Sequence, residues 1–345
     1  MPVKEELKLW KELYETALNV EKEDPWQKLG NAELLGLRYG RKTDTVYMNT
    51  VSDGEEKGIF AYEGNNAFNS YLLMGNIQAV GVSAEFAADS QCSLMAFWGK
   101  EEDVPVDQRN IIHELGYRFE GSEWLYFLSQ EEGTIPVAFR NEEIIRFTKY
   151  LKDYQKLFHA YVRRDIHMDP LTQMYCIWYR QDGTQRGVTS LPFTEYQVAD
   201  LYLDDENMIE KIQEAGRNSS VLEISMGFLR VPVYVDEEGI PLDHPVNPLM
   251  GIIGDRIHQT VVYAEYGKSI GKARYQLAEA LLQYMKENGV PEEVHVRDEI
   301  VESAIRNICD VADAELRRDS VLYVNDDFLN EFVQYTLNQT DKKLS

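Results

Sequence analysis

The chain has 345 residues, which is enough for about two domains of ordinary size. Its hydrophobic content of 44% supplies material for packed cores, and no apolar run approaches the roughly 20 residues that a membrane-spanning helix needs. The formal net charge of -24 gives an acidic surface that repels a phosphate backbone, which argues against non-specific binding of nucleic acid.

The N-terminal residues and the cysteines point to a cytoplasmic protein. Residues 1–7 are charged and lack the apolar centre of a secretory signal. Cys92, Cys176 and Cys309 lie far apart and form no C-x-x-C pair. We therefore expect a reducing compartment, with neither a disulfide framework nor a zinc site.

The first half of the sequence predicts short strands between two helices. Apolar residues three and four apart indicate a helix over 4–22, ended by Asp24-Pro25. A second, long helix is expected from an N-cap at Asn141 to about Tyr161. Between them we expect short helices at 66–73 and 106–115, an ambiguous stretch at 79–91, and strands at 34–38, 45–50, 58–62, 93–98, 124–128 and 135–139.

A charged segment at 163–171 marks the expected domain boundary. It follows the end of the long helix and closes with Asp169-Pro170. We therefore divide the chain into an N-terminal domain at 1–165 and a C-terminal domain at 166–345.

The second half predicts a mixture of strands and helices. Residues 174–179 and 186–191 are expected to form a hairpin across the turn at 181–184. The other expected elements are a helix from Asp204-Asp205 to Gly216, strands at 221–224 and 228–235, the second interrupted by Pro232, and a last helix at 326–337.

Over residues 247–308, turn and cap residues separate the predicted elements more clearly than elsewhere in the chain. Two apolar strands, 249–254 and 260–265, predict a hairpin, and a helix follows over 271–288. A strand at 293–297 and a helix that opens at Asp298 complete the unit. The fold class that follows is α+β with two domains, an antiparallel meander sheet with flanking helices followed by a mixed sheet with helices.

The sequence resembles a family of uncharacterised bacterial proteins built from two domains of unknown function. The motifs that carry the resemblance are Leu13-Tyr14, Pro25-Trp26, Gly58, Tyr62-Glu63-Gly64, residues 112–121, Pro248, Asp255 and Gly289-Val290-Pro291. The resemblance implies a fold and a bacterial origin. It implies no activity and no catalytic residue.

The unit at 247–308 also resembles part of an RNase H-like fold. In that family carboxylates at strand ends hold paired divalent metals, so the resemblance suggests Asp255 and Asp298 as ligands, with Asp236 and Glu265 as weaker additions. The alternative roles are local, because an aspartate suits the turn at Asp255 and the helix N-cap at Asp298. The family also requires a carboxylate inside the first strand, and the strand at 249–254 contains none, which makes the unit a degenerate one.

Lys268, Ser269 and Lys272 form a rare basic spot before a predicted helix. Backbone amides at a helix start, together with two lysines, suit a phosphate. The segment is not a Walker A motif, because Val262 stands where the first glycine should be. Ser269 as an ordinary helix N-cap is the alternative interpretation.

No other familiar catalytic motif is present. The six histidines form neither H-x-x-x-H nor H-E-x-x-H, and no G-x-S-x-G occurs. We therefore expect a non-enzymatic binding or protein-interaction module that needs no cofactor. The alternative from another class is a metal-dependent nuclease or phosphotransfer enzyme that uses Asp255 and Asp298 with a divalent metal. A third interpretation is an acidic decoy for a nucleic-acid-binding protein, which predicts one continuous negative face.

Overall fold

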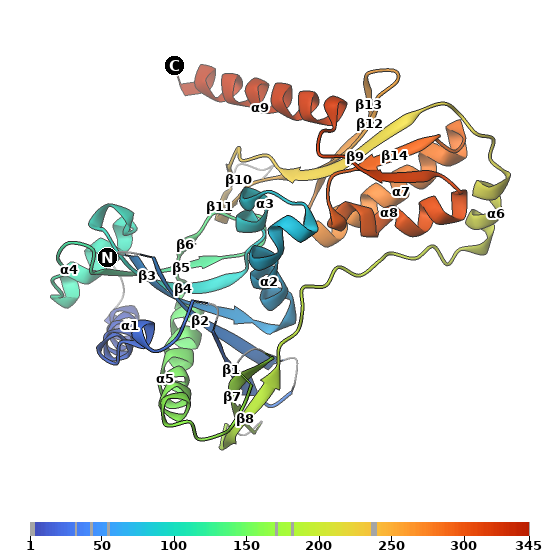
Figure 1. Cartoon of the computed structure of the whole chain (residues 1–345). Coiled ribbons are helices and arrows are strands. Elements are labelled where there is room, and N and C mark those ends of the chain that lie inside the picture. The colour runs from blue at the N-terminus through green and yellow to red at the C-terminus, as the bar shows by residue number, and fades with distance from the viewer. Residues whose placement is uncertain are drawn as a thin grey trace. The chain divides into compact units, whose positions relative to one another are not determined.

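The structure is a computed structural model that describes residues 4–31, 33–41, 44–53, 56–169, 172–180, 183–235 and 240–344, with the backbone alone from 339 onward. Its chain divides into two compact units (Figure 1). The first contains residues 1–72, 91–131 and 136–195, and the second contains 73–90, 132–135 and 196–345. The α+β class and the two-domain organisation are confirmed.

The division of the chain is interleaved, which distinguishes it from the predicted one. We expected a single boundary between residues 165 and 166, whereas the first compact unit extends to Glu195 and the second takes up an early segment at 73–90. The sequence pattern does not reveal that residues 73–90 belong to the second unit. This segment is largely helical, and no linker sets it apart from its neighbours.

The first unit is built on a sheet with the order β6-β5-β4-β3-β2-β1-β7-β8. Neighbouring strands are antiparallel except β1 and β7, which are parallel. The hairpin expected at 174–191 therefore extends the meander of the first unit. The strands are β1 (Leu34–Tyr39), β2 (Thr45–Asp53), β3 (Glu56–Glu63), β4 (Ser93–Gly99), β5 (Trp124–Gln130), β6 (Val137–Ala138), β7 (Gln173–Tyr179) and β8 (Gln185–Pro192).

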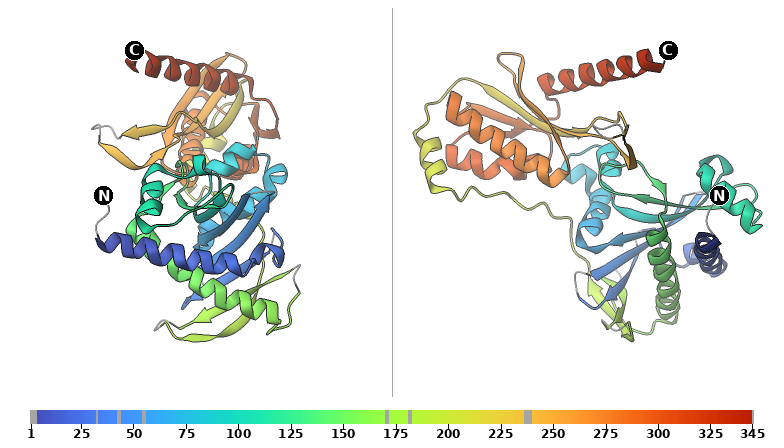
Figure 2. Two further views of the ribbon diagram at one scale, coloured as in Figure 1. Left: turned by 90° about the vertical axis from the view of Figure 1, so that its left-hand side faces the viewer. Right: turned by 180° about the vertical axis from the view of Figure 1, so that it is seen from behind.

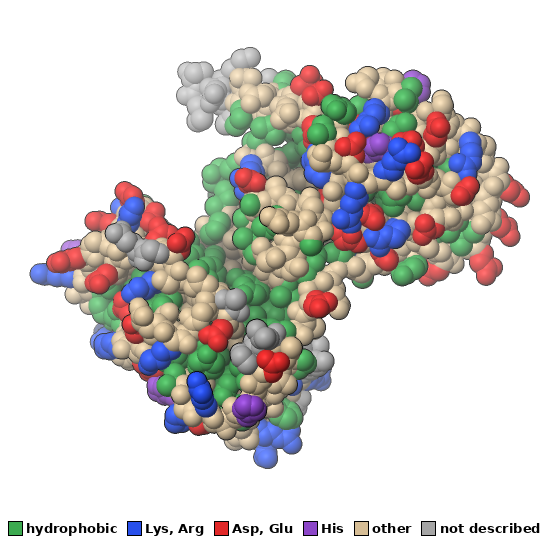
Figure 3. Space-filling view, viewed as in Figure 1, with side chains coloured by type: hydrophobic (Ala, Val, Ile, Leu, Met, Phe, Trp, Pro, Cys, Tyr) green, Lys and Arg blue, Asp and Glu red, His purple; other side chains and the backbone are tan. Residues whose placement is uncertain are grey.

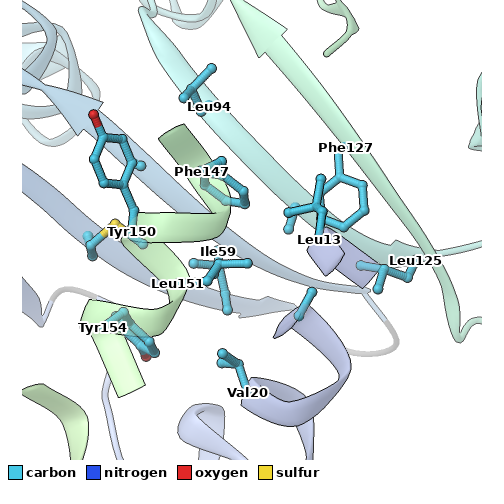
Figure 4. Packing of buried hydrophobic residues seen from close by; sticks show 14 of the residues in the cluster. Leu13, Val20, Ile59, Leu94, Leu125, Phe127, Phe147, Tyr150, Leu151 and Tyr154 are labelled. Atoms are coloured by element: carbon cyan, nitrogen blue, oxygen red, sulfur yellow. The ribbon is translucent and has the colours of Figure 1, made fainter. Parts of the chain in front are cut away.

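Helices cover both faces of this sheet. The long helices α1 (Lys4–Lys22) and α5 (Asn141–Arg163) lie side by side on one face (Figure 2). Figure 4 shows their apolar side chains, among them Leu13, Phe147 and Leu151, packed with Ile59 and Phe127 of the strands. The opposite face holds the first turns of α2 (Gly64–Val80). Shorter helices complete this unit: η1 (Pro25–Gln27), η3 (Glu101–Asp103) and α4 (Val106–Leu115).

Three predictions in the first unit need correction. The N-cap of α5 is Arg140, and Glu143 accepts a hydrogen bond from its backbone N–H, so Asn141 is already helical. The strand expected at 135–139 is only two residues long, because its start belongs to the second compact unit. The helix expected at 66–73 continues to Val80, since its later residues become buried in the second unit's core.

The second unit is built on a mixed sheet with the order β13-β12-β9-β14-β15. The first three strands in this order are antiparallel, and β14 and β15 run parallel to β9. The strands are β9 (Val221–Phe228), β12 (Leu249–Asp255), β13 (Thr260–Gly267), β14 (Glu293–Val296) and β15 (Glu315–Arg318). Strands β10 (Val233–Val235) and β11 (Pro241–Val246) form a separate pair, so the second strand expected at 228–235 begins only after Pro232.

Helices also cover both faces of the second sheet. Helices α7 (Ile270–Asn288) and α8 (Glu299–Ala312) bury one face, and α6 (Glu206–Glu214) and α3 (Ala84–Asp89) join them at its margin. The last helix, α9 (Tyr323–Leu344), packs its first turns on the other face through Phe328 and Phe332 (Figure 1). The unit predicted at 247–308 therefore has the expected order of hairpin, helix, strand and helix. Among the described residues, no helix combines the length and apolar character that crossing a bilayer requires.

Candidate functional site

Asp255 is buried at the end of β12 and organises the turn that follows. Its Oδ1 accepts hydrogen bonds from the backbone N–H groups of Ile257 and His258, at 2.9 and 3.1 Å. Its Oδ2 accepts one from Ser220 Oγ at 2.9 Å and lies 2.7 Å from His258 Nδ1. Burial raises the pKa of Asp255, but these hydrogen bonds, led by those from His258, outweigh it and hold the pKa below its usual value. The hydrogen bonds of this carboxylate therefore fix the turn after β12 and join it to Ser220, which precedes β9.

Asp298 is the N-cap of α8, as one interpretation of the sequence expects. Its Oδ1 accepts a hydrogen bond from the Val301 N–H at 2.9 Å, and its side chain is almost fully buried. That burial raises the pKa of Asp298 to about 6. The group lies in a small pocket of about 170 Å³ with Ser225, Met226 and Arg297.

The strand register separates the two aspartates. Asp255 pairs with Leu222 of β9, which in turn pairs with Val294 of β14. Asp298 follows beyond the end of β14, about 13 Å further along at about 3.3 Å per residue. Two metal ions that share a phosphate lie only about 4 Å apart. The structure therefore does not bring Asp255 and Asp298 together.

The weaker acidic candidates do not complete a metal site either. Glu265 lies exposed on β13, where its carboxylate accepts a hydrogen bond from the Tyr263 hydroxyl at 3.2 Å. Asp236 lies outside the described residues. Within the part of the chain that the structure describes, no three His, Cys, Asp or Glu side chains are grouped to hold a metal ion.

The central strand β9 contains an acid that the sequence interpretation missed. Glu223 is fully buried and faces α9, where its Oε2 accepts hydrogen bonds from the N–H groups of Val324 and Asn325. Its Oε1 lies 2.7 Å from Arg256 Nε, and Arg256 also reaches Asp319. The available signal was a single charged residue within the otherwise largely apolar run 221–228. Its hydrogen bonds fix the start of α9, and its other oxygen forms an ion pair with Arg256.

Ser269 caps α7, and the carboxylate of Glu132 binds the same helix start. Ser269 Oγ accepts a hydrogen bond from the Lys272 N–H at 3.2 Å. The N–H of Ile270 donates to Glu132 Oε1 at 2.6 Å. A carboxylate therefore already binds one of the amides that a phosphate would use. The phosphate site at Lys268, Ser269 and Lys272 stays a prediction.

A groove runs between the edge strand β13 and helix α7. It has a volume of about 490 Å³ and is lined on the strand side by Val262, Tyr263 and Glu265. The helix contributes polar side chains spaced three and four residues apart, which places them along one face. They are Gln276, Glu279, Gln283, Tyr284, Glu287 and Asn288.

The groove carries negative charge along its length. Glu265, Glu279 and Glu287 line it, and none of its described lining residues is Lys or Arg. Burial raises the pKa of Tyr263 to about 12, helped by the charges of Glu265 and Glu279, so two of the carboxylates act on the same phenol. A bound segment with basic side chains would complement these charges.

The strand side of the groove offers backbone hydrogen-bonding groups. Among the described strands, β13 pairs only with β12 and ends the order of the sheet. In an antiparallel strand, alternate residues turn their N–H and C=O groups toward the outer side. An irregularity between Ile253 and Gly254 shifts the register opposite Val262, so the strand is bent at one point of this edge. An exposed edge beside a helix is suited to adding an extended peptide as a further strand.

Comparison with known proteins agrees with the two-part organisation. Residues 10–177 match the model of a domain of unknown function (DUF7309), and residues 208–333 match that of a second one (DUF6930). The two matches support an uncharacterised two-domain family. In that coarse form the predicted resemblance is confirmed. No curated protein matches the chain.

Proposed function

We propose that this chain is a non-catalytic binding module that takes a basic, extended segment of a partner protein in the β13–α7 groove. The observation that carries the proposal is a combination of two features. The outer edge of β13 pairs with no other described strand, and the carboxylates of Glu265, Glu279 and Glu287 line the groove beside it. The strand edge supplies hydrogen bonds that are independent of side chains, and the carboxylates supply the preference for Lys and Arg.

The length of the groove suits a short peptide. Gln276 and Glu287 lie about 17 Å apart along α7 at about 1.5 Å per residue. An extended strand covers that length with about five residues. Because side chains of a strand alternate between two faces, every second residue of the partner segment would face the carboxylates. We therefore infer a segment in which basic and apolar residues alternate.

We further propose that the second unit is an RNase H-like module without that family's paired-metal chemistry. The support is its strand order, with an antiparallel three-stranded part followed by two parallel strands that α7 and α8 precede. β9 precedes the strand at 249–254 in the chain and is therefore the first strand of this sheet, and its Glu223 is engaged by Arg256 and α9. Asp255 lies at the opposite end of the sheet from Asp298. These placements favour binding over the nuclease alternative.

The decoy interpretation has less support. It requires one continuous negative face, and in Figure 3 basic and acidic side chains are interspersed on the visible face of the second unit. A bacterial, cytoplasmic setting is part of our proposal. The cytoplasmic part is supported by the cysteines, because Cys92, Cys176 and Cys309 form no disulfide with one another.

Charge reversal in the groove tests the binding function. The probe is a fluorescein-labelled octapeptide that alternates Lys and Val, and its affinity is measured by fluorescence anisotropy at low and physiological salt. We expect E265K/E279K/E287K to weaken binding at least about tenfold, since three attractive contacts become repulsive. Wild-type binding should also weaken as salt rises.

The matched control reverses three exposed acids on helix α6 of the same unit. E206K/E210K/E214K changes the net charge by the same amount at residues that do not line the groove. We expect this variant to stay within about twofold of wild type. An equal loss of affinity in both variants would mean that the peptide responds only to the overall charge of the protein. That result would contradict the proposal.

A further inference from the structure

The first unit contains a pocket of about 600 Å³ where helix α5 ends. Tyr161 and Arg164 come from that helix end, and the segment that follows contributes Ile166, His167 and Met168. Tyr175 of β7 closes the inner side. The volume lies within the range of about 300–1,000 Å³ typical of sites for small molecules.

The pocket gathers basic side chains in a strongly acidic chain. Lys28, Arg164 and His167 line it, and none of them has an ion-pair partner among the described residues. Lys28 lies with its Nζ 5.3 Å from the centre of the Phe158 ring. The net charge of the whole chain is -24, whereas the described lining of this pocket holds Lys28 and Arg164 against Glu33 alone.

The one carboxylate in the described lining is already engaged by neutral donors. Glu33 Oε1 accepts a hydrogen bond from the Tyr161 hydroxyl at 2.7 Å, and Glu33 Oε2 accepts one from the Gly30 N–H at 2.7 Å. Both carboxylate oxygens of Glu33 are therefore hydrogen-bonded within the protein. Lys28 and Arg164 therefore remain available to pair with a bound anion.

An apolar and aromatic wall faces the basic groups. The rings of Tyr161 and Tyr175 pack edge to face, with centroids 5.2 Å apart. Ile166 and Met168 are half-buried against the core of the first unit. Burial raises the pKa of Tyr161 to about 12, so its hydroxyl stays protonated and keeps donating to Glu33. The wall is therefore neutral and suits the body of an organic molecule.

We propose that this pocket binds a small organic anion, with its acidic group at Lys28, Arg164 and His167 and its aromatic or aliphatic body against Tyr161, Ile166 and Met168. The proposal concerns the first unit and is independent of the peptide groove. A carboxylate and a phosphate could both pair with Lys28 and Arg164 and accept a hydrogen bond from His167, and the test separates them.

The first probe is 8-anilinonaphthalene-1-sulfonate, an aromatic anion whose fluorescence rises in apolar surroundings. We expect saturable binding to the full chain, with chemical-shift changes at residues 161–168 in a ¹H–¹⁵N spectrum. K28Q/R164Q should weaken binding at least about fivefold. The matched control K8Q/R118Q, which removes two exposed cations elsewhere in the first unit, should leave it within about twofold.

Competition and a neutral analogue complete the experiment. Benzoate or phenyl phosphate should displace the probe, and the stronger of the two identifies the acidic group. Inorganic phosphate should compete far less, because it has no apolar part that could contact Tyr161, Ile166 and Met168. Three outcomes would overturn the proposal: no saturable binding at millimolar probe, equal loss in the pocket and control variants, or equal affinity for uncharged N-phenyl-1-naphthylamine. Melting curves of both double variants establish that they are folded.

Discussion

Asp255 and Asp298 are both buried carboxylates, but their surroundings act on them in opposite directions. Asp298 is desolvated and has a raised pKa of about 6, whereas hydrogen bonds hold the pKa of Asp255 below its usual value. The folded state therefore keeps the proton of Asp298 at pH values where the unfolded chain, with a pKa of about 3.9, releases it. Stability from this group falls as the pH rises from about 4 to 6.

Replacing Asp298 by Asn removes this pH dependence while keeping a residue that can cap α8. We expect the stability of D298N relative to wild type to rise by roughly 2–3 kcal/mol between pH 4 and pH 7, because two pKa units correspond to about that free energy. Hydrogen exchange of the Val294 and Val296 amides reports on the unfolding of this unit.

Asp255→Asn is the counterpart with the opposite sign. A lowered pKa contributes stability that is present above about pH 4 and is lost as the pH falls through the folded-state pKa. D255N should therefore cost most at neutral pH and least near pH 3. If both variants changed in the same direction with pH, the environments assigned to the two carboxylates would be incorrect.

At the scale of elements, the contact between β12 and the start of α9 leaves no room for a side chain at Gly254. A Cβ there would lie 2.5 Å from Asn325 Oδ1 and 2.8 Å from Val324 Cγ1. Gly254→Ala should therefore displace the first turn of α9 and destabilise the second unit by about 1–3 kcal/mol. Gly227→Ala on β9 is the control, since a Cβ there meets nothing within 4 Å. Equal effects of both substitutions in urea unfolding would argue against this contact.

Local signals in the sequence predicted individual elements well. Asp205, Ser269 and Asp298 are N-caps as expected, and Gly116 ends α4 with a φ of 77°, which favours glycine. The side-chain spacing that predicted the elements of residues 247–308 depends only on neighbouring residues. Elements stabilised by distant partners were missed, among them β15, a four-residue strand with an exposed pattern that pairs with β14.

The candidate site was less accessible to sequence reasoning. Glu279, Gln283 and Glu287 are spaced four apart, which indicates one polar helix face and nothing more specific. They become a groove only because β13 ends the sheet beside them, and the order of strands is a long-range property. The pairing of Asp255 with Asp298 depends on the same property, because β12 and β14 run in opposite directions and place the two residues at opposite ends of the sheet.

At the scale of the whole molecule, the interleaved chain predicts that the C-terminal half does not fold as a complete unit. Leu73, Val80 and Phe86 are buried in the core of the second unit, although they precede most of it by more than a hundred residues. Burial of each such side chain stabilises by about 1.5–3 kcal/mol. A fragment of residues 196–345 should therefore show faster amide exchange in β9 and β14 than the full chain. Equal protection would show that the early segment is dispensable.

We propose that the second unit binds an extended basic segment between β13 and α7. The most direct test of this proposal is chemical-shift mapping of the full chain with the alternating Lys-Val octapeptide, with a Glu-Val octapeptide as the control. We expect the largest changes at residues 262–265 and 276–288, and none with the Glu-Val peptide. Changes spread over the acidic surface, or centred on α6 or α9, would contradict it.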